Sequence, residues 1–303
     1  MFKIFDFFIG LIMEDFMENK KKIRNHPVLD HTVLGYFLLI LWVQVITSFG
    51  SLIDNPLGNV IPGYGSSMEV MGFTIPTTTG IGTAVFAVIA LLIHKLWFAP
   101  NYKGALSKDL LIKGILMLAP LFVCHGIGSL VSCAVLGFGN IGIAALRALA
   151  PGFGEEVMFR GLGISNFMRT IKDEKKIPLI LWLSAIVFGF AHMSNSVVGA
   201  SLTTSLIQSL YAMGIGLAFG AVYLRTGNLW PSIIAHYLID FLEFCRADLS
   251  SSNGIMGELT IGDHITLVVG FLAIFWGCYL CRKSKRAEIM AVWQKKWNKQ
   301  EEI

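Results

Sequence analysis

The stretch PGFGEEVMFRGLG, residues 151–163, places two adjacent carboxylates, Glu155 and Glu156, and one guanidinium, Arg160, in an otherwise apolar, glycine-rich run. Apolar residues make up 54% of the 303-residue chain and charged residues only 15%, and the mean hydropathy is +0.66. These values lie on the apolar side of ordinary soluble proteins. The composition therefore predicts a membrane protein, in which charges inside apolar runs require an explanation.

Several apolar runs in the chain are long enough to cross a bilayer, which takes about 20 residues in a helix. The candidate spans are residues 32–53, 80–100, 110–138, 141–169, 178–193, 201–224, 229–245 and 265–281. No internal repeat and no long linker divides them. The sequence predicts an all-α, polytopic bundle of about eight transmembrane helices at residues 32–281, with the candidate site in its C-terminal half.

The basic residues fall in alternate connections between these runs, at 20–24, 103–108, 169–176, 225 and 282–286. The intervening loops, including residues 54–79, contain no Lys or Arg. Because basic loops stay in the cytoplasm, we expect a multi-pass protein, of the cell membrane, with both termini cytoplasmic. Residues 1–31 are then an interfacial or cytoplasmic segment and residues 282–303 a basic cytoplasmic tail. Basic clusters beside spans are membrane anchors, so the bilayer is the expected partner and nucleic acid is not.

Three of the predicted spans carry polar groups at helical spacing. Glu156 and Arg160 are four residues apart and share a helix face, whereas Glu155 points about 100° away. His192 follows Phe188 by four residues in FGFAH, and HYLID carries His236 and Asp240 at the same spacing. Each pair alone is compatible with helix packing, but two carboxylates, two histidines, an Asp and an Arg on three neighbouring helices predict a functional site.

The depths of these groups in the bilayer agree only in part. Glu155 and His192 each lie about 14 residues, at a rise of about 1.5 Å per residue, from the predicted cytoplasmic ends of their helices. His236 and Asp240 lie nearer to that side. We therefore expect that the helix after NLWP begins inside the protein or that the helices tilt.

The three motifs, EEVMFR at 155–160, FGFAH at 188–192 and HYLID at 236–240, resemble a known family. They follow the order EExxxR, FxxxH and HxxxN/D of the CAAX prenyl protease and bacteriocin-processing (CPBP, abortive-infection) family of intramembrane endopeptidases. The resemblance covers residues 150–244 and defines a family core at about 140–246 within the bundle. It departs at Asp240, where many relatives have Asn.

The resemblance implies an intramembrane endopeptidase that acts on a membrane-associated peptide or protein. Glu155, with His192, would hold and deprotonate the water. His236 and Asp240 would stabilise the oxyanion, Asp240 either as the neutral acid or by orienting His236. Glu156, Arg160 and Phe188 would shape the site.

Two alternatives stay open from the sequence. Glu155, His192 and His236 would supply three ligands of a catalytic zinc, although no HExxH is present, and a mechanism without metal or other cofactor is favoured. A non-catalytic bacteriocin-immunity protein or a transporter could use the same polar cluster. His94 and His125 lack acidic partners at helical spacing, and His26, His31 and His264 lie at helix borders, so these histidines are interpreted as structural.

Overall fold

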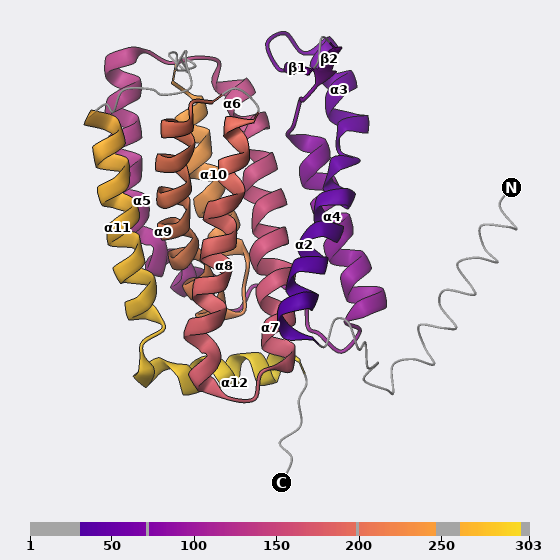
Figure 1. Cartoon of the computed structure of the whole chain (residues 1–303), viewed down its shortest axis with the longest axis vertical. Coiled ribbons are helices and arrows are strands. Elements are labelled where there is room, and N and C mark those ends of the chain that lie inside the picture. The colour runs from indigo at the N-terminus through magenta and orange to yellow at the C-terminus, as the bar shows by residue number, and fades with distance from the viewer. Residues whose placement is uncertain (1–30, 71–72, 198–199, 247–260, 298–303) are drawn as a thin grey trace, which may run out of the picture.

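A computed structural model gives the fold for residues 31–70, 73–197, 200–246 and 261–297. The predicted interfacial segment at 1–31 lies almost wholly outside these residues. The described chain is nearly all helical, as predicted, and its helices run roughly side by side along the long axis (Figure 1). The one exception is a short antiparallel hairpin, β1 (Ser67–Val70) with β2 (Phe73–Pro76), in register from Ser67↔Pro76 to Val70↔Phe73.

The N-terminal group of elements comprises α2 (Thr32–Ser48), α3 (Ser51–Val60), the hairpin, α4 (Ile81–Ile93) and the π-helical turn η2 (His94–Phe98). Residues 54–79, expected as a loop, instead contribute most of α3 and the hairpin. The buried Asp54 carboxylate explains this difference, since it accepts hydrogen bonds from the backbone of Gly80, Gly82 and Thr83 at 2.8–3.1 Å. It thereby caps α4 and anchors α3 to it, a contact between distant residues.

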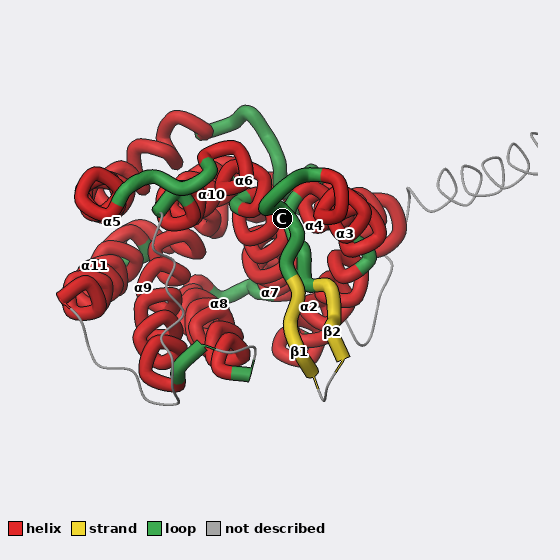
Figure 2. Tube along the Cα trace, turned by 90° about the horizontal axis from the view of Figure 1, so that it is seen from above, coloured by secondary structure: helices red, strands yellow, loops and turns green. Residues whose placement is uncertain are grey.

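The middle of the chain contains α5 (Leu111–Leu136), which has Pro120 in its interior, and a long helical run. That run consists of α6 (Ile141–Arg147), the π-helical segment η3 (Ala150–Ile164) and α7 (Ser165–Thr170). Seen from above, it lies between the α2 to α4 group and the remaining helices (Figure 2). The stretch that holds Glu155, Glu156 and Arg160 is therefore surrounded by protein.

The C-terminal part comprises a further set of helices. They are η4 (Glu174–Lys176), α8 (Ile177–Ala191), η5 (His192–Ser196), α9 (Leu202–Thr226), α10 (Trp230–Phe244), α11 (Ile261–Leu280), η6 (Lys283–Lys285) and α12 (Arg286–Lys296). The most buried of the long helices is α9, which packs against α8 on one side and α11 on the other (Figure 2). In Figure 1, α12 lies across one end of the bundle.

Five helical segments in the described residues are long and apolar enough to cross a membrane, at 33–60, 81–98, 111–135, 174–196 and 202–226. A sixth is obtained if α11 and α12, bent by 54°, count as one broken span. The predicted number of eight is therefore not confirmed. The segment η3 alone carries three charges, and α10 has 15 residues, about 22 Å, against a hydrocarbon thickness of about 30 Å. Both are internal helices sheltered by their neighbours.

One end of the bundle gathers the basic connections, as the alternating charges predict. The Lys296 ammonium group donates to the Gly104 carbonyl at 2.9 Å, and Arg225 pairs with Glu288 at 3.1 Å. The Arg169 guanidinium lies 5.9 Å from the Trp297 ring centroid. We call this the basic end, and call the opposite end, which carries β1 and β2, the hairpin end (Figure 1). The segment expected as a basic tail thus contains a helix that closes the bundle.

Candidate active site

The first predicted motif lies on η3, whose 15 residues form i to i+5 hydrogen bonds instead of the α-helical pattern. Such π-helical segments are rare and occur frequently at functional sites. Glycines allow neighbouring elements to approach closely here. A Cβ on Gly152 would lie 2.9 Å from the Tyr237 Cβ on α10, and one on Gly163 would lie 2.4 Å from the Tyr36 ring on α2. The glycine-rich sequence therefore brings η3 directly against α10.

Glu156 and Arg160 form the predicted ion pair, and both side chains are fully buried. Arg160 Nη1 donates to Glu156 Oε1 at 2.8 Å. The guanidinium also lies over the Phe188 ring, with 3.9 Å between its central carbon and the ring centroid. That cation–π contact contributes to the stability of a charge that has only one hydrogen-bonded side-chain partner.

His236, on α10, connects the two adjacent carboxylates of η3. Its Nδ1 lies 2.9 Å from Glu156 Oε1, and its Nε2 lies 3.9 Å from Glu155 Oε2. A carboxylate oxygen accepts hydrogen bonds, so Nδ1 carries a proton toward Glu156. The ring is held at Nδ1 while Nε2 faces Glu155, and the imidazole is almost completely buried.

Asp240 lies on the same side of His236 as Glu155. Its Oδ2 is 3.6 Å from His236 Nε2, which is longer than a direct hydrogen bond. The sequence leads us to expect that Asp240, when ionised, orients His236, but the carboxylate in hydrogen-bonding contact with the ring is Glu156. The side chains of Glu155 and Asp240 are 35% and 25% exposed, so this side of the cluster is open.

His192 begins η5, directly after the last residue of α8. Its Nδ1 lies 2.9 Å from the Phe188 carbonyl oxygen, which can only accept. In the neutral ring Nδ1 therefore carries the proton and Nε2 is left as an acceptor. The Phe188 ring packs edge-to-face against both imidazoles, with its centroid 4.9 Å from that of His192 and 5.9 Å from that of His236.

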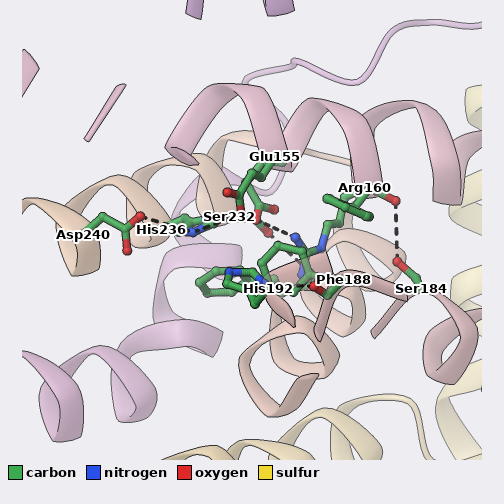
Figure 3. Close-up of polar contacts among 11 residues, drawn as sticks. Glu155, Arg160, Ser184, Phe188, His192, Ser232, His236 and Asp240 are labelled. Atoms are coloured by element: carbon green, nitrogen blue, oxygen red, sulfur yellow. Dashed lines mark hydrogen bonds and ion pairs between the residues drawn. The ribbon is translucent and has the colours of Figure 1, made fainter. Parts of the chain in front are cut away.

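The structure gathers all seven predicted residues, from η3, α8 with η5, and α10. Figure 3 shows Glu155, Arg160, Phe188, His192, His236 and Asp240 around one centre. The expected difference in depth is resolved at the start of α10. Asn228 and Leu229 are fully buried, and the Leu229 amide donates to the Ala105 carbonyl at 3.0 Å. The helix thus begins inside the protein.

The sequence did not predict two neighbours, an aromatic ring beside the candidate site and an acidic partner of His125. The Phe219 ring, on α9, lies 5.6 Å from the His236 ring and 5.7 Å from the Arg160 guanidinium, yet its sequence context is that of any core aromatic. Further along α10, Glu243 lies 3.4 Å from His125, a histidine interpreted as structural. The search for acidic partners of His125 within its own helix could not find a partner on another one.

A three-ligand zinc site finds no support in the geometry. Within the ranges that the structure describes, no group of three or more His, Cys, Asp or Glu side chains is arranged to hold a metal ion. The zinc alternative would require Glu155, His192 and His236 to converge on one ion.

Comparison with known proteins gives one match. Residues 137–242 match the family described as type II CAAX prenyl endopeptidase Rce1-like. No curated protein and no solved structure matches the chain. The matched range contains all three motifs and covers about a third of the chain, so the predicted resemblance is confirmed.

Proposed function

From the Rce1-like domain at residues 137–242, we propose that this integral membrane protein is an intramembrane endopeptidase. Its substrates would be membrane-associated peptides or proteins. The observation that carries the proposal is the division of labour between the adjacent carboxylates. Glu156 is buried and contacts both Arg160 and His236 through Oε1, whereas the Glu155 side chain is 35% exposed. Glu155 is therefore the carboxylate available to a water and a substrate.

Glu155 acts as the general base in this mechanism. It takes a proton from a water held between its carboxylate and His192 Nε2, and the resulting hydroxide attacks the peptide carbonyl. Glu155 then returns the proton to the nitrogen of the leaving amine, which departs as the C–N bond breaks. The backbone carbonyl of Phe188, by holding His192 Nδ1–H, keeps Nε2 as the acceptor this step needs.

His236 is the proposed oxyanion stabiliser. Its Nε2 lies 3.6 Å from Asp240 and 3.9 Å from Glu155, so it faces the same partly exposed side of the cluster as these two carboxylates. Glu156 accepts from Nδ1–H, so the ring is fixed before the negative charge develops, and Nε2 donates to the oxyanion when the ring is protonated at both nitrogens. Asp240 donates to the oxyanion only in its neutral acid form. Arg160 and Phe188 keep Glu156 and the two histidines in place.

We further propose that the protein resides in the cell membrane with the basic end, and hence both termini, on the cytoplasmic side. The basic end contains the lysines of η4 and η6, whereas the hairpin connection from 61 to 80 contains no Lys or Arg. The candidate site would then act on segments that reach it within the bilayer.

The decisive experiment compares purified wild type with Glu155→Gln in detergent or nanodiscs. The probes are two C-terminal peptides of one sequence, with and without a prenyl group on the cysteine. We expect wild type to cleave and Glu155→Gln to lose about 10² to 10⁴ in rate with an unchanged melting temperature, because only the base is removed. Glu174→Gln, on η4 at the basic end, is the matched control and should be fully active.

Two outcomes would contradict the proposal. Absence of cleavage with both peptides and with a mixture of detergent-solubilised membrane proteins would remove the peptidase function. Near-normal turnover by Glu155→Gln would remove Glu155 as base. The same assay with a strong chelator tests the zinc alternative, since we expect activity to persist and purified protein to contain no stoichiometric zinc.

A further inference from the structure

A second polar cluster lies one helical turn beyond the candidate site along α10. Glu243 follows Asp240 by three residues, so the two carboxylates lie on neighbouring positions of one helix face. Around Glu243 the structure gathers polar side chains from two other helices and from just beyond the end of α10, namely His125 and Ser129 on α5, Tyr211 on α9, and Arg246. None of the three family motifs contains these residues.

The Glu243 carboxylate is engaged at both oxygens. Ser129 Oγ donates to Oε1 at 2.6 Å, and Arg246 Nη1 donates to Oε2 at 3.1 Å. His125 Nε2 lies 3.4 Å from Oε1. Because Ser129 and His125 both belong to α5, Glu243 links the C-terminal half of α10 to α5.

His125 has a second contact through its other ring nitrogen. Nδ1 lies 2.7 Å from the Tyr211 hydroxyl, and the two rings stack with their centroids 5.6 Å apart. Nε2 faces Glu243 Oε1 at 3.4 Å without a direct hydrogen bond, and in the tautomer with the proton on Nε2, Nδ1 accepts the hydroxyl hydrogen of Tyr211. The imidazole, 12% exposed, is thus held between α9 and α10.

The charged groups of this cluster interact electrostatically with those of the candidate site. Asp240 lies in electrostatic range of His125 as well as of His236, His192 and Glu155. Tyr211 lies in range of both Asp240 and Glu243. A histidine in an apolar span is expensive, and α5 between 111 and 135 is otherwise apolar enough to cross a membrane. Its contacts with Glu243 and Tyr211 suggest a role in this part of the bundle.

We propose that His125 is a positioning residue for the candidate site. By engaging Glu243 it fixes the rotation of α10, and with it the face that presents His236 and Asp240 to η3. The effect on turnover rests on the proposed peptidase function, but the effect on the position of His236 does not. The two can therefore be tested apart.

The test substitutes His125 by Leu and by Gln and follows the ring ¹⁵N signals of His236 in histidine-labelled protein. These signals report the carboxylates on both sides of the ring. We expect His125→Leu to shift them and His125→Gln, whose amide still donates toward Glu243, to restore them. His94→Leu is the matched control, because His94 is also buried in the bundle but packs against Phe98 and Tyr102 on the opposite side of η3. Tyr211→Phe, which removes one hydroxyl, serves if His125→Leu does not fold.

The kinetic readout is a split between kcat and KM. We expect His125→Leu to lose about 10- to 100-fold in kcat, with KM little changed. A loss of this size is typical when a group that orients an active-site side chain is removed. Unshifted His236 signals in a folded His125→Leu protein, or in Tyr211→Phe if the former fails to fold, would overturn the proposal. Shifted signals in a wild type that cleaves nothing would support the positioning role and contradict the peptidase function.

Discussion

Glu156 is the residue on which two cations of the candidate site converge. One oxygen of its carboxylate receives Arg160 Nη1 at 2.8 Å and faces His236 Nδ1 at 2.9 Å, with the whole side chain buried. In water either contact alone would be worth little, but removing one member of a buried pair leaves an uncompensated charge. Glu156 thus both stabilises the fold, by neutralising Arg160, and orients His236.

Replacing Glu156 by Gln should therefore lower stability, in contrast to Glu155→Gln. We expect a loss of about 3 to 5 kcal/mol, because Arg160 stays buried without its counter-charge. The double variant Glu156→Gln with Arg160→Met should recover part of the melting temperature but little activity, since His236 still lacks its carboxylate. Thermal melting and cleavage in one detergent check both. A stable but inactive Glu156→Gln protein would mean that the roles of the two carboxylates are exchanged.

At this scale the sequence predicted partners on one helix and missed partners between helices. Glu156 and Arg160 are four residues apart, and that spacing brings them together in either an α- or a π-helix. The contact between Glu156 and His236 joins residues 80 apart in the chain, and no periodicity connects them. For the same reason the sequence does not predict the contact of His125 with Glu243, in which Nε2 lies 3.4 Å from Oε1.

At the scale of elements, the close approach of η3 and α10 determines the distance between Glu155 and His236. It depends on Gly152, whose backbone meets the residue after His236. The Tyr237 Cβ, Cα and N atoms lie 2.9–3.2 Å from where a Cβ on Gly152 would be. Backbone atoms cannot move aside as a flexible side chain does, so any side chain there displaces α10.

Gly152→Ala should accordingly impair turnover more than folding. We expect a loss of about 10- to 100-fold in kcat, because shifts well below 1 Å disturb catalytic geometry. Gly142→Ala, in the same helical run, is the control. A Cβ there would meet only the Asn140 Oδ1 atom at 3.4 Å, so activity should be unchanged. Equal activity of the two variants in a cleavage assay would show that the spacing of η3 and α10 is not critical.

Helix type and the hairpin were the element-level features that the sequence did not predict. The apolar content of residues 141–169 indicates a helix, but η3 is buried on nearly all sides, so its sequence has no one-sided apolar period that would distinguish an α- from a π-helix. Residues 54–79 contain Pro56, several glycines and polar residues typical of a loop. They form α3 and β-structure because Asp54 and Tyr64 contact the start of α4, 17 to 29 residues away.

At the scale of the whole molecule, the basic end is closed by α12. Lys296 is buried there, and its ammonium group donates to the Gly104 carbonyl. Burial lowers the pKa of Lys296 from 10.5 to about 8, with Lys103 adding to the effect and Asp109 opposing it. Below pH 8 the amine is protonated in the folded and unfolded states alike, so the folded protein bears the full cost of a buried charge.

Stability should therefore increase as the pH rises from about 8 toward 10.5, where the unfolded chain still binds the proton that the folded chain has released. The relief is about 3 kcal/mol at most over this window. The measurement is the melting temperature of wild type against Lys296→Met at a series of pH values. The difference should shrink steadily above pH 8, and a constant difference would show that the amine does not titrate in this range.

The arrangement of charges also predicts orientation. A reporter inserted after Lys175, on η4, should lie in the cytoplasm, and one inserted after Gly65, next to the hairpin, should lie outside. The prediction rests on the lysines and arginines that share the basic end. Accessibility of the two reporters in intact cells checks it, and the same location for both would show that the connecting helices do not cross the membrane as proposed.

The contacts of α12 also determine when during synthesis the bundle can be completed. Trp293 Nε1 donates to the Leu224 carbonyl and Trp297 Nε1 to that of Ser165, so α12 touches helices synthesised about 70 and 130 residues earlier. Until the ribosome has passed residue 297, Tyr102 and Tyr223 lack the indole rings that cover them. A nascent chain interrupted after α11 would carry every residue of the three motifs and still present an unsealed aromatic surface to quality-control proteases. The bundle is therefore complete only after α12 and Trp297 have been synthesised and packed.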